Sequence, residues 1–248
     1  MKAINTKFTR QLLSSIGLYQ PIRAIYRYFE HRQEVAFYSK LLEFDDLCFD
    51  VGANVGKKTA ALLEAGMRVV AFEPQPGCMY ELKARCRDYR GRLADRQCAV
   101  GAEPGELTLY VSAIDSHSSL KQNWLGEESV DEIQVPVITL DQAIAEFEKP
   151  DYCKINVEGW EYEVLKGLTQ PIPLISFEYH LSEVDQALAC LDYLSRFGLL
   201  RINLRAQGRS MFTYQDDGLP LEEFLNLFPD TLRSLKGYSY GDIFVRIF

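Results

Sequence analysis

The sequence predicts an open, doubly wound α/β sheet whose strands are mostly parallel. Three observations support this fold class. Apolar strand-like runs alternate with helical patterns along the chain, and the run that begins at Leu47 passes directly into a glycine-containing loop. A later run, RVVAFEP, ends in Glu73, which is 23 residues after the acidic end of the first run at Asp50. Such alternation implies right-handed crossovers, so the carboxyl ends of the parallel strands share one edge of the sheet.

The first predicted strand ends in a loop that reads LCFDVGANVG over residues 47–56. The apolar run ends in Asp50, and Gly52 and Gly56 lie in the loop before a predicted helix. Glycine lets the backbone turn tightly and approach a ligand, and a helix N-terminus offers free N–H donors. An acidic residue about 20 positions further on typically binds ribose hydroxyls, and Glu73 has that position. The spacing predicts a ribose-containing cofactor; the simpler alternative is an ordinary strand–helix turn.

The loop pattern also discriminates between cofactors. Dinucleotide sites use GxGxxG, whereas this chain has DxGxNxG, from Asp50 through Asn54 to Gly56. A carboxylate before the first glycine would repel a pyrophosphate but suits a ligand with a cationic end. S-adenosylmethionine carries an amino group and a sulfonium. We therefore predict that this edge of the sheet binds S-adenosylmethionine, and the pattern disfavours a nicotinamide dehydrogenase.

A third strand is predicted from Arg96 to Val100, with its end beside the adenine of the cofactor. Ala99 and Val100 are small and apolar, as contact with a flat base requires, although any strand end can carry such residues. Both residues are therefore candidates for cofactor binding.

Two polar segments are candidates for substrate contact. Strands predicted over residues 106–111 and 133–138 are joined by a polar segment longer than most connections, which contains His117. This segment either faces the substrate, with His117 as a minor candidate for proton transfer, or is a solvated loop. Arg205, Arg209 and Tyr214 lie in a second polar stretch, where they would meet an anionic or sugar substrate or point into solvent.

Four polar residues follow the fourth and fifth predicted strands. The stretch KINVEGW places Asn156 and Glu158 after strand four, and ISFEYH places Glu178 and His180 at the end of strand five. The carboxyl ends of central parallel strands form the ligand crevice of such sheets. A histidine titrates near neutrality, and an adjacent carboxylate would orient it and raise its pKa. We predict that Glu158 or His180 acts as the catalytic base, with Glu178 orienting the histidine. Alternatively, Glu158 caps the next helix and His180 only hydrogen-bonds at the strand end.

Length and composition set the size and environment of the protein. The chain has 248 residues and 47% hydrophobic content, enough to bury one good core. It has no run of 18 apolar residues and no secretory signal pattern. Its six cysteines form no CxxC pair and lie mainly in apolar patterns, as expected of reduced thiols. We therefore expect a cytoplasmic protein.

The charge of the chain is unevenly distributed. The net charge of −8 argues against a nucleic acid as the main partner. Residues 1–32 nevertheless contain six Lys or Arg and one acid, a charge of +5, which leaves −13 for the remainder. From Pro21 onward, apolar residues recur close to helical spacing. This helix would cover one edge of the sheet, or touch an anionic membrane surface or a partner protein. We divide the chain into a helical extension, residues 1–44, and a cofactor-binding domain, residues 45–248.

Together these motifs resemble those of the FkbM-type methyltransferases. The matching pieces lie within residues 45–248 and read FDVGANVGKKT, VVAFEPQP, VITLD, KINVEGWEYEVLKG, ISFEYH and GDIFVR. The resemblance implies a class I methyltransferase fold of seven strands, the last antiparallel, with S-adenosylmethionine above strands one, two and four. It also implies that Asp50, Gly52, Asn54 and Gly56 border the methionine part and Glu73 the ribose. Because family members are associated with O-methylation, often of sugars, a saccharide or natural-product acceptor is expected.

One residue departs from the family pattern. Strand four usually reads KIDVEG, and here Asn156 replaces the aspartate. An amide can only hydrogen-bond, whereas a carboxylate can also act as a base or metal ligand. The replacement favours a metal-independent reaction, because hard cations prefer several carboxylates, and it assigns Asn156 to cofactor binding. It also leaves open a second function, that of a non-catalytic S-adenosylmethionine-binding or scaffold protein.

Overall fold

The strand that precedes the glycine loop lies at the centre of the molecule. This strand, β1 (Leu47–Val51), is buried along its whole length and pairs in parallel with β2 (Arg68–Phe72) and β7 (Tyr152–Ile155). Burial on both faces explains why these strands are almost continuously apolar. The computed structural model describes residues 18–112, 118–122, 131–206, 209–214, 217–234 and 239–248.

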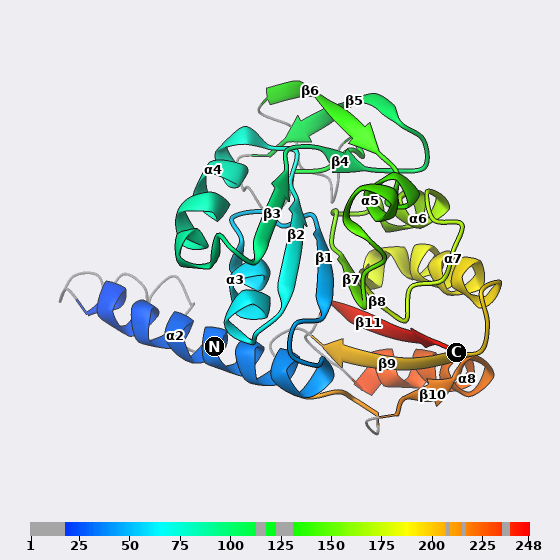
Figure 1. The fold of residues 1–248 in the computed structure, drawn as a ribbon. Helices are drawn as coiled ribbons and strands as arrows, with labels where there is room; N and C mark the ends of the chain where they lie inside the picture. Colours follow the sequence, from blue (N-terminus) through cyan, green and yellow to red (C-terminus); the bar gives the residue numbers. More distant parts are fainter. Residues whose placement is uncertain (1–17, 113–117, 123–130, 207–208, 215–216, 235–238) are drawn as a thin grey trace.

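The main sheet has eight strands in the order β10-β9-β11-β8-β7-β1-β2-β3 (Figure 1). Its other strands are β3 (Leu93–Arg96), β8 (Leu174–His180), β9 (Leu200–Ala206), β10 (Leu219–Pro220) and β11 (Tyr240–Ile247). The strands β1, β2, β3, β7 and β8 pair in parallel, whereas β11 runs antiparallel between β8 and β9. The predicted sheet of seven mostly parallel strands with an antiparallel last strand is confirmed. The short strand β10 adds to its edge.

A separate three-stranded sheet contains β4 (Ala99–Val100), β6 (Asp131–Ile138) and β5 (Gly105–Val111) in that order. The prediction of one strand from Arg96 to Val100 is therefore wrong. The main-sheet strand ends at Arg96, and Ala99 and Val100 pair instead with residues of β6. The chain thus crosses from one sheet to the other within three residues, which apolar patterning alone does not reveal.

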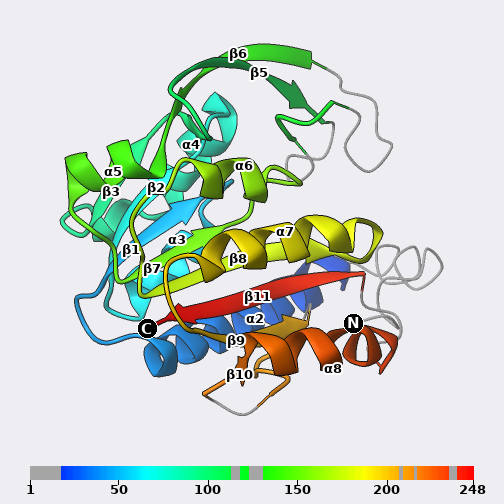
Figure 2. The same ribbon diagram turned by 90° about the vertical axis from the view of Figure 1, so that its right-hand side faces the viewer.

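Helices cover both faces of the main sheet. One face carries α2 (Tyr19–Leu41), α3 (Lys57–Glu64) and α4 (Pro76–Arg85), and the other α5 (Leu140–Phe147), α6 (Glu161–Lys166) and α7 (Val184–Ser195). Figure 2 shows α7 and α2 on opposite sides of β11. The remaining helices are α8 (Leu221–Ser234), beside β9 and β10, and the 3₁₀ turns η1 (Arg87–Tyr89) and η4 (Leu181–Glu183). Alternate strand residues therefore enter two separate apolar layers.

The helix α2 has two different halves. Its second half packs against α3 and the sheet through Val35, Phe37 and Tyr38, which are buried. Its first half extends beyond the domain, as Figure 1 shows.

Among the described residues, no helix has the length and apolar character needed to cross a bilayer. The six cysteines are all buried and unpaired, as their sequence context predicts.

Candidate functional site

A cavity of about 860 Å³ opens at the carboxyl ends of β1, β2, β7 and β8. The small sheet contributes Leu109 and the nearby Leu120 to its wall, and the start of β11 contributes Tyr240. Nine of the residues predicted from sequence line this cavity: Gly52, Asn54, Glu73, Ala99, Val100, Asn156, Glu158, Glu178 and His180. The residues proposed for the cofactor and those proposed for catalysis thus share one cavity. Asp50 and Gly56 are not among its lining residues.

Glycine is needed at the two loop positions, 52 and 56, for different structural reasons. Gly52 has a φ of 72°, and a Cβ atom there would lie 1.8 Å from the backbone oxygen of Asn156. No side chain fits at this position, because the loops after β1 and β7 touch through their backbones. Gly56, with a φ of 74°, begins α3, and its backbone lies against Leu82. Gly56 therefore shapes the turn, and its direct contact with a ligand stays a prediction.

Asp50 lies beneath the cavity in an ion pair that the sequence interpretation did not identify. Its Oδ1 is 2.9 Å from Nζ of Lys154, and its Oδ2 accepts a hydrogen bond of 2.7 Å from Thr59. Both charged side chains are almost completely buried. Burial alone would lower the pKa of Lys154, but the Asp50 carboxylate outweighs it and raises that pKa, so the lysine stays charged. Lys154 also donates to the Gly52 oxygen at 3.1 Å. Asp50 therefore supports the glycine loop through Lys154.

Glu73 lies at the end of β2 with its carboxylate in the cavity wall. Its two oxygens accept hydrogen bonds of 2.8 Å from the backbone N–H groups of Asn54 and Gln75. Burial raises the pKa of Glu73, and these two bonds oppose the rise. Each carboxylate oxygen can accept more than one bond, so Glu73 can also accept from the hydroxyls of a ribose. With Ala99 and Val100 lining the same cavity, this donor and acceptor set fits S-adenosylmethionine.

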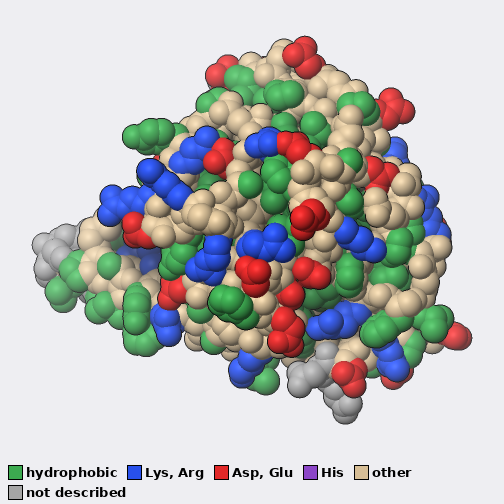
Figure 3. Space-filling model, viewed as in Figure 1, with side chains coloured by type: hydrophobic (Ala, Val, Ile, Leu, Met, Phe, Trp, Pro, Cys, Tyr) green, Lys and Arg blue, Asp and Glu red, His purple; other side chains and the backbone are tan. Residues whose placement is uncertain are grey.

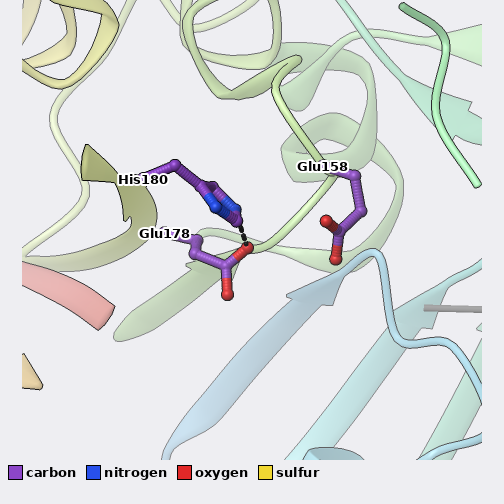
Figure 4. Close-up of side chains that lie close together, drawn as sticks. All are labelled: Glu158, Glu178 and His180. Atoms are coloured by element: carbon purple, nitrogen blue, oxygen red, sulfur yellow. Dashed lines mark hydrogen bonds and ion pairs between the residues drawn. The ribbon is translucent and has the colours of Figure 1, made fainter. Parts of the chain in front are cut away.

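The predicted catalytic residues form a cluster on neighbouring loops and strands (Figure 4). Nε2 of His180 lies 3.0 Å from Oε2 of Glu178, and both side chains are largely buried. Burial alone would lower the pKa of His180, but the hydrogen bond and negative charge of Glu178, together with Glu158, raise it. The His180 ring also stacks on Tyr240, with 5.5 Å between ring centroids. The imidazole is thus oriented on two sides, as a proton-transfer group requires.

The loop that carries Glu158 is held by hydrogen bonds between its backbone and the side chains of Ser119 and Glu161. Glu158 and Gly159 have positive φ values of 54° and 89°. The Ser119 hydroxyl donates to the backbone oxygen of Glu158 at 2.6 Å, and Oε1 of Glu161 accepts from the backbone N–H groups of Val157 and Gly159 at 3.1 and 3.3 Å. Burial raises the pKa of Glu161 to about 7. The sequence interpretation placed Glu161 only on a helix, whereas the structure makes it the residue that positions the loop of Glu158.

Replacement of Glu161 tests this positioning role. Glu161→Ala leaves two backbone N–H groups without their acceptor and is expected to lower the free energy of unfolding by roughly 2–5 kcal/mol. Glu161→Gln keeps an oxygen at the same place and should retain most of the stability and activity. Chemical denaturation and methyl-transfer assays of both variants would check this. Equal losses in the alanine and glutamine variants would contradict the positioning role.

The same cluster has the geometry of a cation site. Glu158, Glu178 and His180 each offer one oxygen or nitrogen ligand, and these atoms lie within 4.8 Å of one another. Two carboxylates and an imidazole are ligands that divalent metals accept. The absence of a metal requirement therefore stays a prediction, to be tested together with the function.

A second ionic network links α2 to the cavity. Glu34 of α2 accepts hydrogen bonds of 2.6 Å from Lys58 of α3 and from Arg205 of β9. Burial would raise the pKa of Glu34, but these two cations lower it below its ordinary value. Arg205 lines the cavity, but its guanidinium is engaged by Glu34, while Arg209 lies in the cavity wall nearby. Tyr214 is not among the residues that line the cavity, and its hydroxyl lies 2.7 Å from Oγ1 of Thr231. His117 lies outside the described residues.

Comparison with known proteins identifies the family. The family model described as the methyltransferase FkbM domain matches residues 50–211. The chain belongs to the FkbM methyltransferase family. The cofactor of this FkbM methyltransferase is S-adenosylmethionine, in agreement with the Glu73 and glycine-loop geometry.

One curated relative and several solved structures are similar to this FkbM methyltransferase. The hexuronic acid methyltransferase AglP of Haloferax volcanii is 28% identical over 163 residues, which cover 64% of this chain and 66% of that relative, just under two thirds of its length. A precorrin-6Y C5,15-methyltransferase from Geobacter metallireducens has a TM-score of 0.45 and 11% identity, covering 87% of this chain and 86% of that one. The fibrillarin of Aeropyrum pernix, solved with S-adenosyl-L-methionine bound, has a TM-score of 0.45 and 10% identity, covering 82% and 67%. Scores this low carry no information about substrate.

Proposed function

We propose that this FkbM methyltransferase transfers a methyl group to a hydroxyl of a saccharide, without a metal ion and with a side-chain base. The observation that carries the proposal is the His180–Glu178 pair, facing the same cavity as the glycine loop and Glu73. A hydroxyl must lose a proton as its oxygen is methylated, so a base within hydrogen-bond reach accelerates the reaction. Asn156, an amide, would serve binding and not catalysis.

Different residues of the cavity would bind the cofactor and accept the proton. S-adenosylmethionine, when bound, supplies an electrophilic methyl group. Glu73 would hold the ribose hydroxyls, and the loop around Gly52 would let the backbone approach the cofactor. His180 or Glu158 would accept the proton of the acceptor hydroxyl, and Glu178 would orient the imidazole and stabilise its charged form. Methyl transfer needs the two reactants in line, so much of the rate would come from orientation in the cavity.

The acceptor is proposed to be an acidic saccharide. The relative from Haloferax volcanii is named for a hexuronic acid, and the basic residues Lys57 and Arg209 line the cavity of this protein. A hexuronic acid offers both hydroxyls and a carboxylate. Near neutral pH the carboxyl group is already ionised, so only the hydroxyl still carries a proton that a base could remove. The His180–Glu178 pair therefore favours formation of a methyl ether over a methyl ester.

The test has a binding stage and a transfer stage. Calorimetric titration with S-adenosylmethionine and S-adenosylhomocysteine, with NAD as the control, should show binding of the first two compounds alone. Glu73→Ala should weaken that binding. Labelled methyl transfer is then measured to a glucuronoside and to the matched glucoside, with and without EDTA. Transfer to the glucuronoside that survives mild alkali, which hydrolyses esters but not ethers, would support the proposal.

Three results would overturn parts of it. An alkali-labile product would indicate a methyl ester and remove the need for a base. Inhibition by EDTA that Mg²⁺ or Mn²⁺ restores would make the cluster of Glu158, Glu178 and His180 a metal site. Cofactor binding without transfer to either glycoside or to a broad panel of sugars would favour the second candidate function, a non-catalytic S-adenosylmethionine-binding protein.

A further inference from the structure

The first half of α2 exposes large apolar side chains. Ile25, Tyr28 and Phe29 are 58%, 61% and 59% exposed, and all residues from 23 to 30 are exposed. Figure 3 shows hydrophobic side chains gathered where this part of α2 projects from the domain. Isolated helices of this length gain little stability from propensity alone. An exposed apolar surface of this kind marks an interaction site.

Four apolar side chains of this part of α2 lie on one face of the helix. Leu18, Ile22, Ile25 and Phe29 follow the spacing i, i+4, i+7 and i+11, which places them in one stripe. Tyr26, i+8 in this series, extends the stripe at its edge. The stripe is thus apolar along its centre and has an aromatic side chain with a polar tip at its margin. Such a distribution suits a boundary between an apolar phase and water.

The second half of α2 anchors this stripe to the domain. Glu34 binds Lys58 and Arg205, and Phe37 packs on Phe244, with 5.6 Å between the ring centroids, and lies beneath the Arg205 guanidinium. These contacts hold the helix axis in place, so the exposed stripe is carried on a rigid base. Because Glu34 also lines the cavity, one helix connects the stripe to the cavity.

The charge of this part of the chain indicates what binds to the apolar stripe of α2. The exposed part of α2 carries Arg23 and Arg27, which make no ion pair among the described residues, against Glu30 as its one acid. Residues 1–32 have a charge of +5, while the rest of the chain has −13. An anionic surface would attract this basic N-terminal segment, which includes the first half of α2, and repel the rest of the chain, so the segment would approach it first. Arg23 and Arg27 lie on the opposite face of the helix from the stripe, and basic residues on the polar face are a feature of helices that lie in a membrane interface.

We propose that the first half of α2 docks this protein on an anionic phospholipid surface. Ile25 and Phe29 enter the interfacial region, and Arg23 and Arg27 on the polar face are attracted by the negative charge of the lipid headgroups. The docked helix lies in the interface and does not cross it. If the proposed methyl transfer holds, docking keeps the cavity close to acceptors at that surface; docking itself does not depend on the reaction.

Co-sedimentation with vesicles tests the proposal. The full chain should sediment with vesicles of phosphatidylglycerol and phosphatidylcholine, bind pure phosphatidylcholine far less, and dissociate as salt rises. The double variant Ile25→Ser, Phe29→Ser should lose at least about tenfold in partitioning, because two exposed apolar anchors are removed. The control replaces Tyr80 and Leu199, which are 77% and 79% exposed elsewhere on the surface, by serine, and should bind like the parent.

Three outcomes would overturn the proposal. The first is no binding to anionic vesicles by the parent chain. The second is equal loss in the α2 variant and the control, which would remove the role of the stripe. The third is a dimer that forms in solution without lipid and is abolished by Ile25→Ser, Phe29→Ser, which would assign the stripe to a second copy of this chain. Because all readouts are of binding, they stand or fall separately from methyl-transfer activity.

Discussion

Replacing Lys154 by methionine is expected to lower the free energy of unfolding by about 3–5 kcal/mol, since removing one partner of a buried ion pair leaves the other charge uncompensated. In this protein the remaining charge would be Asp50, whose side chain is fully buried and would retain only its bond to Thr59. Methionine has a similar length and adds no polar group, so the loss reports the charge and not a cavity. Denaturant titration followed by circular dichroism measures it.

The matched control is the double variant Asp50→Asn, Lys154→Met. It removes both charges, so most of the lost stability should return, as buried ion pairs replaced by neutral residues are often tolerated. The double variant should still bind S-adenosylmethionine at least tenfold more weakly than the parent, because no ammonium remains to hold the Gly52 oxygen at 3.1 Å. A loss below about 1 kcal/mol in Lys154→Met, the range of an exposed ion pair, would contradict the burial of this pair.

The sheet and much of the cavity were predictable because apolar periodicity and strand-end polarity follow directly from the parallel architecture. Residues at the carboxyl ends of β1, β2, β7 and β8 must meet at one edge of the sheet, so the sequence alone places Gly52, Glu73 and His180 together. The histidine–carboxylate pair follows from strand geometry, since Glu178 and His180 are two residues apart and so lie on one face of β8.

Interactions between distant segments could not be predicted in the same way. Lys154 pairs with Asp50 across more than 100 residues, and only the register of β7 on β1 places them opposite each other. A lysine inside an apolar strand was the available signal, because a buried charge requires a partner. Glu161 gave no such signal, since a glutamate in the first turn of a helix is ordinary. The displacement of Ala99 into a second sheet depends on pairing with β6, which local sequence does not encode.

Replacing His180 by alanine is expected to slow methyl transfer by about 10²–10⁴-fold, the usual contribution of a general base, with little change in S-adenosylmethionine affinity. The pH profile gives a sharper test. Glu178 and Glu158 raise the pKa of His180 above its ordinary value of 6.5, and only the neutral imidazole accepts a proton. The rate should therefore rise with pH through this raised pKa and then level off.

The variant Glu178→Gln separates catalysis by His180 from a structural effect. Glutamine can still hydrogen-bond to the imidazole but carries no charge, so the pKa of His180 should fall and the rise in rate should move to lower pH. A simple loss of structure would reduce the rate at every pH without moving the midpoint. A pH-dependent rise that persists unchanged in His180→Ala would exclude His180 and assign the base to Glu158. Loss of the pH-dependent rise in His180→Ala, together with its shift to lower pH in Glu178→Gln, would therefore assign the proton transfer to His180.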